Sequence, residues 1–341
     1  MRNKIRRFIF AAFCTAAVML SLTACGGDSR QSVEQSVGDE QIFYMKLAHN
    51  MAEDHVVHIQ LTSFAEAVEQ ASNGTISIQV IPDGILGTET DNISQIQAGA
   101  LDMAKVSAAT LGNFNTKWDA LSVPYVFCNQ EHYYNVMDGE IAQELYQATE
   151  SDGFIGLTWL DSGVRSFYTA NTPIRTPDDL AGLRIRTMDS RLAVDMMNAL
   201  GGTSVIMDYS DIYTGMQQGF IDGAENNVTA LRDHADVAGY YCYDEHTRIP
   251  DIVVISTSVW NSMSDNQRQI MTECATQASI EYKTAWKNFE DEVLASVEGK
   301  VELITDVNTD AFQEACQPIY ESLKVSNPEA FSIVEQIQNA G

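Results

Sequence analysis

The chain has 341 residues, 47 of them acidic and 20 basic, and its formal net charge at pH 7 is −27. This acidic excess argues against nucleic acid as a partner, because a phosphate backbone would be repelled. It does not exclude a small anionic ligand, since exposed charges are screened over about 8 Å at physiological salt and arginines inside a closed cleft act locally.

The N-terminus has the pattern of a bacterial export signal. Residues 1–7 carry four positive charges, and residues 8–24 are uncharged and mostly apolar. A run of this length barely meets the requirement for crossing a bilayer. It ends in Leu22-Thr23-Ala24-Cys25, which resembles a lipoprotein cleavage box.

We therefore expect residues 1–24 to be a signal peptide and Cys25 to become the lipidated N-terminus of an extracytoplasmic protein anchored to the membrane. The polar residues 25–40 are typical of a flexible tether. An ordinary secretory peptide with a chance cysteine is the alternative. Without the first 24 residues the chain has 16 basic and 47 acidic residues, a net charge of −31.

Four further cysteines follow Cys25, and none of them lies in a CxxC pair. Their irregular spacing does not fit a zinc ribbon. We expect free thiols, and one disulfide is the alternative that an exported location permits. The four are Cys128, Cys242, Cys274 and Cys316.

Strands and helices alternate along the chain in the way that is typical of parallel α/β sheets. The length of the mature chain exceeds one typical core and predicts two lobes. Expected strands are residues 44–48, 76–81 and 101–107, then 183–187, 204–207 and 221–224. Expected helices are residues 55–71 and 90–98, then about 190–200, 209–218 and 227–235. The sequence has no repeat with a period of about 20–50 residues, which excludes a solenoid.

Residues 265–297 contain no proline or glycine, and apolar residues recur there every three or four positions. The pattern predicts one long helix of roughly 50 Å, at about 1.5 Å per residue. A single lobe does not need a helix of that length, so we expect it to run behind two lobes and brace them. Two helices with an unmarked break are the alternative.

Motifs of catalysis are mostly missing from the sequence. It contains no Gly-rich phosphate loop, no GxSxG elbow and no HExxH helix. His55 and His58 lie three apart on one helix face, near His49, Glu53 and Asp54, but no further ligand has matching spacing. We therefore expect neither a metal nor another cofactor.

Two arginines stand out in the expected strand 183–187. Arg184 and Arg186 alternate with Leu183 and Ile185, as in a half-buried sheet. Arg186 lies nearer the carboxyl end of the strand, where open α/β sheets place their ligands. Arg186 is therefore the better candidate for a ligand contact.

Three motifs lie around and after this strand. They are G-x-R-S-F-Y-T from Gly163, P-I-x-x-P-D-D-L-x-G-L-x-I-R up to Arg186, and Gly219-Phe220-Ile221-Asp222-Gly223-Ala224-Glu225-Asn226-Asn227. In this combination the chain resembles the DctP-type binding proteins of tripartite ATP-independent periplasmic (TRAP) transporters. The likeness extends from about Lys46 to about Val301 and includes Gly87, Leu101-Asp102, Pro124-Tyr125, Trp260 and the long helix.

The resemblance implies an α/β, two-lobed periplasmic-binding-protein fold in which the long helix bridges both lobes. It also implies a cleft that closes over a carboxylate, with Arg186 as the main anchor and Arg165 and Asn226 as helpers. A guanidinium suits that role because it meets a carboxylate with two parallel hydrogen bonds. We expect lobe 1 to comprise residues 41–162 and about 252–290, and lobe 2 to comprise residues 163–251 and about 291–341.

Selectivity for the rest of the ligand is expected from strand ends and loops of both lobes. The candidates are His49, Asn50, Lys105, Ser107, Tyr209, His246 and Asp251. Together they offer more donors and acceptors than a plain C4-dicarboxylate requires, so hydroxyl-rich sugar acids fit better.

We therefore interpret the chain as a monomeric TRAP solute-binding protein and not as an enzyme. It is expected to close on a sugar acid, a hexuronate such as glucuronate or galacturonate, and to deliver it to the large and small permease subunits. The rival ligand is a C4-dicarboxylate or a 2-keto acid, because Arg186, Arg165 and Lys105 together could hold two carboxylates.

Two rivals come from other classes of protein. A surface glycan-acting enzyme would use Asp161, Asp189 or Glu225 as acid and base, although no motif places these carboxylates as a pair. A sensory protein that feeds a receptor would share the same pocket.

Overall fold

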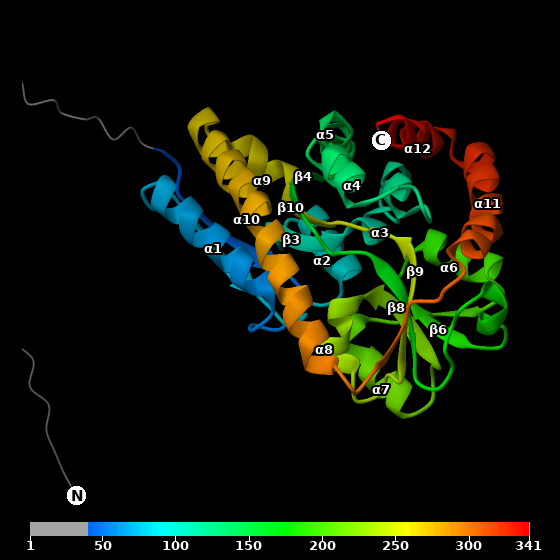
Figure 1. The fold of residues 1–341 in the computed structure, drawn as a ribbon. Helices are drawn as coiled ribbons and strands as arrows, with labels where there is room; N and C mark the ends of the chain where they lie inside the picture. The colour runs from blue at the N-terminus through cyan, green and yellow to red at the C-terminus, as the bar shows by residue number, and fades with distance from the viewer. Residues whose placement is uncertain (1–39, 341) are drawn as a thin grey trace, which may run out of the picture. The chain divides into compact units, whose positions relative to one another are not determined.

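A computed structural model describes residues 40–340 of the chain, and Figure 1 shows how their helices and strands are arranged. The expected signal peptide, the expected lipidation site at Cys25 and nearly all of the expected tether lie outside these residues. Within residues 40–340 no helix is both long enough and apolar enough to cross a membrane.

The strands form two sheets, which confirms the predicted α/β class. The first sheet contains β1 (Phe43–Ala48), β2 (Ile76–Ile81), β3 (Met103–Ser107), β4 (Phe154–Leu160) and β10 (Asp251–Ser256). Its spatial order is β2-β1-β3-β10-β4. β1 pairs in parallel with β2 and β3, whereas β10 is antiparallel to β3 and β4.

The second sheet contains β5 (Arg165–Thr169), β6 (Arg184–Thr187), β7 (Thr203–Ile206), β8 (Gly223–Asn227), β9 (Tyr240–Thr247) and β11 (Glu302–Ile304). Its spatial order is β11-β9-β5-β8-β6-β7. β8 begins later than the expected strand 221–224, because the Asp222 carboxylate binds Arg184 and parallel pairing with Ile185 starts at Gly223.

Helices connect the strands of each sheet. Those near the first sheet in sequence are α1 (Val56–Ala71), α2 (Glu89–Gln97), α3 (Ala108–Leu111), α4 (Gln130–Met137), α5 (Glu140–Gln147) and α9 (Thr257–Ser262). Those among the strands of the second sheet are α6 (Arg191–Ala199), α7 (Ile212–Gln217) and α8 (Leu231–His234). Shorter 3-10 turns include η1 (Thr116–Ser122), η4 (Tyr209–Asp211) and η5 (Val228–Ala230).

The long helix α10 (Asp265–Val297) is unbroken and has the predicted bounds. Its start is set by a capping box between Ser264 and Gln267. One part of α10 packs on α1 and β4 of the first sheet, and another part packs on η5 and α8, next to the second sheet. In Figure 1 the helix, drawn in orange, runs beside α1 toward α8. The expectation that it braces both sheets is therefore confirmed.

The C-terminal segment contains two helices that pack on different parts of the fold. α11 (Thr309–Ser326) packs on α6 and β9 of the second sheet, as expected for residues 291–341. α12 (Pro328–Asn339) instead packs on η1 and α5, and its Ile337 carbonyl lies 2.8 Å from the His132 ring. α12 also packs on α11, so it contacts helices associated with both sheets. The expected lobe boundaries stay a prediction.

The chain passes between the two sheets at neighbouring points. Residues 161–164 join β4 to β5, and residues 248–250 join β9 to β10. Gly163 has a φ of 64°, and a Cβ there would lie 2.7 Å from Glu290 Oε1 and 3.1 Å from Trp286 Nε1 of α10. A side chain here would force the Glu290 carboxylate to move, and the positive φ also favours glycine. Cys128, Cys242, Cys274 and Cys316 are all free thiols.

Candidate functional site

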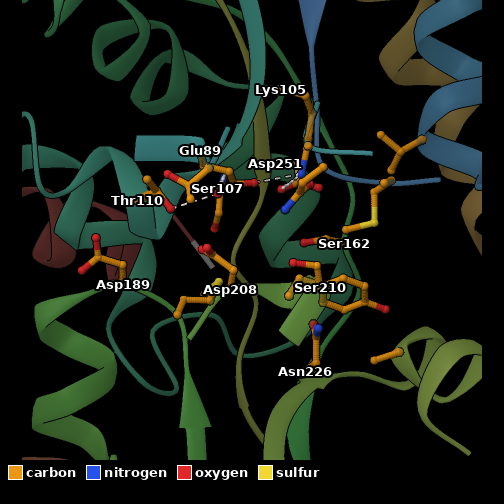
Figure 2. Close-up of a pocket in the computed structure, with 18 of the residues that line it drawn as sticks. Glu89, Lys105, Ser107, Thr110, Ser162, Asp189, Asp208, Ser210, Asn226 and Asp251 are labelled. Carbon is orange, nitrogen blue, oxygen red and sulfur yellow. Dashed lines mark hydrogen bonds and ion pairs between the residues drawn. The ribbon is translucent and has the colours of Figure 1, made fainter. Parts of the chain in front are cut away.

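A cavity of about 630 Å³ lies beside the two crossovers and is lined by residues from both sheets (Figure 2). Its volume is in the range of pockets that bind small molecules. Eight of the ten predicted ligand contacts line it, and they are Asn50, Lys105, Ser107, Arg165, Arg186, Tyr209, Asn226 and Asp251. His49 and His246 do not line it.

Arg186 is held in the cavity wall by β6, which pairs with β7 on one side and β8 on the other. The side chain is buried, and its Nε donates to the Met207 carbonyl at 2.7 Å. No carboxylate within residues 40–340 forms an ion pair with it, and burial lowers the pKa of its guanidinium. Arg184, two residues earlier in the same strand, pairs with Asp222 at 2.9 Å. Arg186 is therefore a buried cation with donors left for a ligand.

Arg165 also lines the cavity, but most of its donors already have partners. Its Nε and Nη2 bind the two carboxylate oxygens of Glu225 at 2.7 and 3.0 Å. Nη2 also donates to the Glu225 carbonyl at 2.8 Å, and Nη1 donates to Asn226 Oδ1 at 2.7 Å. Burial acts to lower the pKa of Arg165, but the charge of Glu225 outweighs it and the net shift is upward.

Behind Arg165 lies a buried chain of alternating charges. His246 contacts Glu225 Oε2 through Nε2 at 3.3 Å and Asp244 Oδ2 through Nδ1 at 2.7 Å. Burial lowers the pKa of His246, but Asp244 and Glu225 together raise it to about 9, so the ring is cationic at neutral pH. Burial raises the pKa of Glu225, but Arg165 and His246 lower it to about 2. His246 thus orients Arg165 through Glu225 instead of facing the cavity.

Asn226 supplies a donor beside the arginines. Its Oδ1 accepts from Arg165 and from the Asn227 backbone at 2.9 Å, which assigns the other end of the amide as Nδ2. Within the described part of the chain, Nδ2 donates to no residue, and the side chain lines the cavity. Arg186 and Asn226 together therefore offer N–H donors suited to a carboxylate.

A second buried charge cluster lies on the first-sheet side of the cavity. Lys105 Nζ is 3.1 Å from Glu89 Oε1 and 3.2 Å from Asp251 Oδ1. Glu89 Oε2 accepts from the Ser107 backbone at 3.0 Å and from Thr110 Oγ1 at 2.9 Å. Burial raises the pKa of Glu89, but Lys105 reverses this, whereas burial dominates and raises the pKa of Asp251. Lys105 is therefore already neutralised by protein carboxylates.

The remaining predicted contacts have different roles. Tyr209 donates to Asp233 at 2.8 Å at the cavity edge, and Asn50 Oδ1 is buried without a partner among residues 40–340. His49 is buried and 3.0 Å from the His58 ring, and burial lowers the pKa of His49 to about 3. No group of three or more His, Cys, Asp or Glu side chains within residues 40–340 could hold a metal ion.

Sequence reasoning missed several polar residues of the cavity, among them Glu89, Asp208 and Ser162. Asp208 follows β7, and its position after a strand was a usable signal. Glu89 opens α2 directly after its N-cap residue Thr88, and nothing local in the sequence marks it as a partner of Lys105.

Two of the three carboxylates of the glycan-enzyme rival are bound to other protein groups. Asp161 accepts from the Tyr134 hydroxyl and the Gly163 backbone, and Glu225 is bound to Arg165. Only Asp189 lines the cavity.

Comparison with known proteins gives one family and many related structures. Residues 47–326 match the family model DctP, described as bacterial extracellular solute-binding protein, family 7. The YiiZ protein of Salmonella typhimurium is 41% identical over 280 residues, which cover 81% of this chain and 85% of that protein.

Two solved structures have similar folds and bound ligands. A TRAP periplasmic solute-binding protein from Anaerococcus prevotii with bound D-glucuronate is 34% identical, with a TM-score of 0.81, over 87% of this chain and 97% of that one. Another from a Sulfitobacter species with bound β-D-galacturonate is 30% identical, with a TM-score of 0.84, over 87% of this chain and 100% of that one.

Proposed function

The chain belongs to the DctP family of TRAP-transporter solute-binding proteins, and we propose that it closes on a hexuronate and delivers it to the membrane permease. Glucuronate and galacturonate are the expected ligands. Closure is a hinge motion between the two sheets, and the ligand shifts the equilibrium by its higher affinity for the closed form.

The observation that carries this proposal is the state of Arg186. It is a buried guanidinium in the cavity wall, with one carbonyl partner and no carboxylate partner among residues 40–340. A buried cation without a counter-charge is costly, and a ligand carboxylate would supply that charge. Arg165 and Asn226 line the same cavity, are hydrogen-bonded to each other, and would orient the same carboxylate.

A hexuronate is favoured over the rival acids by two observations. The Anaerococcus and Sulfitobacter proteins bind hexuronates, and each shares the fold over 87% of this chain. In addition, Lys105 and Arg165 are both ion-paired within the protein, which speaks against their holding a second ligand carboxylate.

The similar proteins favour a role in transport without catalysis. The matching family model and the similar structures are those of solute-binding proteins. We propose that the cavity catalyses no reaction. Of Asp161, Asp189 and Glu225, the acid and base candidates of the enzyme hypothesis, only Asp189 lines the cavity. Turnover of a uronate-containing glycan by the purified protein would contradict this.

A thermal-shift screen tests the proposed ligand class. Residues 26–341, first checked by light scattering as a monomer, are mixed with uronates, aldonates, C4-dicarboxylates and 2-keto acids. A hexuronate at a hundredfold excess over Kd should stabilise the fold by about 2.7 kcal/mol. A larger shift with succinate or pyruvate than with both glucuronate and galacturonate would refute the hexuronate proposal.

The family places the protein outside the cytoplasm, and we propose that Cys25 anchors it to the membrane through a lipid. Leu22-Thr23-Ala24-Cys25 supports this. In cell fractionation, Cys25→Ser should move the protein from the membrane to the soluble fraction, whereas the exposed-thiol control Cys128→Ser should leave it in the membrane. A Cys25→Ser protein that is still processed and still membrane-bound would rule out the anchor.

A further inference from the structure

Carboxylates outnumber cations around the cavity. The acidic residues that line it are Asp83, Glu89, Asp91, Asp189, Asp208 and Asp251, and the basic residues are Lys105, Arg165 and Arg186. Arg165 is neutralised by Glu225, and Lys105 lies between two carboxylates. Of these three cations, only Arg186 has no carboxylate partner within the described residues.

The first-sheet side of the cavity is an acceptor surface. Glu89 and Asp251 share the single positive charge of Lys105, so the cluster carries an excess of negative charge. Asp251 Oδ1 contacts Lys105, while Asp251 Oδ2 accepts no hydrogen bond from residues 40–340. In Figure 2 these side chains lie at the top of the pocket and Asn226 lies at the bottom. Asn226 and the acceptor surface are thus on different sides of the pocket.

Asp208 adds a further carboxylate from the second sheet. It precedes η4, is exposed, and its side chain accepts no hydrogen bond from the N-terminus of that turn. Burial and the charge of Asp211 raise the pKa of Asp208, and the charge of Arg186 acts to lower it, whereas Asp91 and Glu89 of α2 act to raise it. Carboxylates from both sheets therefore lie within electrostatic range of one another across the cavity.

We propose that Glu89, Asp251 and Asp208 form a charge filter, which admits acids that carry one carboxylate and several hydroxyls and rejects acids with a carboxylate at each end. The hydroxyls of a sugar acid donate hydrogen bonds to these acceptors, whereas a second carboxylate meets like charge without a free cation. This inference rests on the proposed function, in which Arg186 binds the first carboxylate. It extends that function by excluding aldarates, which have the carbon skeleton of a hexuronate.

The test compares three acids with one skeleton by calorimetric titration. D-glucuronate is the reference, D-glucarate adds the second carboxylate, and D-gluconate, also an open chain, controls for the loss of the ring. Weak ligands are measured by competition against glucuronate. Wild-type protein should bind glucarate at least about thirtyfold more weakly than gluconate, which corresponds to about 2 kcal/mol.

Variants separate charge from shape. Asp208→Asn and Asp251→Asn should each raise the affinity for glucarate, relative to glucuronate, about tenfold. The exposed control Glu66→Gln on α1 should leave that ratio unchanged. Asp251 is buried beside Lys105, so unfolding of the ligand-free variants is measured first. The exposed Asp208 variant keeps the test valid should Asp251→Asn fail to fold.

Three results would overturn the filter. Wild-type protein could bind glucarate as tightly as glucuronate, the ratio could stay unchanged in both variants, or glucarate could fail to bind every variant. In each case binding of glucuronate would still support the proposed function. Failure of glucuronate and galacturonate themselves to bind wild-type protein would instead refute the proposed function.

Discussion

Replacing Arg186 with lysine is expected to weaken the binding of hexuronates by about 100-fold, and replacing it with alanine is expected to abolish measurable binding. Lysine keeps the charge but loses the paired N–H groups that meet both oxygens of a carboxylate. Each hydrogen bond to a charged group contributes about 1.5–3 kcal/mol, and tenfold in affinity corresponds to about 1.4 kcal/mol. Titration calorimetry with glucuronate and galacturonate measures the effect.

The matched control is Arg184→Lys on the same strand. Arg184 pairs with Asp222 and does not line the cavity, so its replacement should leave ligand affinity within about twofold of wild type. Retention of wild-type affinity by Arg186→Lys, or an equal loss in both variants, would mean that Arg186 is not the specific anchor.

Replacing Glu225 with glutamine is expected to destabilise the fold by about 3 kcal/mol at pH 7. The change removes one charge from a buried pair and leaves Arg165 without its partner, which costs about 3–5 kcal/mol in buried ion pairs. The lowered pKa of Glu225, from 4.5 to about 2, indicates a similar size at about 1.4 kcal/mol per unit. Denaturant unfolding compares the variant with wild type, and the exposed-residue control Glu314→Gln should change stability by less than about 0.5 kcal/mol.

The pH dependence provides an independent check of the same ion pair. Because the pKa of Glu225 is lower in the folded state than in the unfolded state, its stabilisation is fully present above about pH 4.5 and is lost as the pH falls toward about 2. The difference in unfolding free energy between wild type and Glu225→Gln should therefore shrink over this window. A difference that stays constant from pH 7 to pH 2.5 would show that the glutamine acts by a steric change and not through charge.

Features that depend on short stretches of chain could be predicted from the sequence. The choice of Arg186 over Arg184 follows from its place nearer the carboxyl end of the strand, where open α/β sheets place their ligands. The bounds of α10 follow from an apolar repeat without proline or glycine and from the capping residues Ser264 and Gln267. The alternation of strands and helices gave the α/β class for a similar reason.

The states of the charged groups could not be predicted in this way, because they depend on partners that are distant along the chain. Lys105 lines the cavity, and its ion pairs are with Glu89 and Asp251, which are 16 and 146 residues away. His246 was expected at the ligand and instead supports Glu225, because the antiparallel pairing of β5 with β8 and β9 brings the three strands together.

The sequence by itself determined which residues carry the charges, the class of fold and the family that they resemble. The tertiary structure decided which of those charges are already neutralised and which one remains for a ligand. The physical reason is that an ion pair requires two groups within about 4 Å, and that distance is fixed only when both sheets and their crossovers have formed. Arg186 is the cation that this arrangement leaves for the carboxylate.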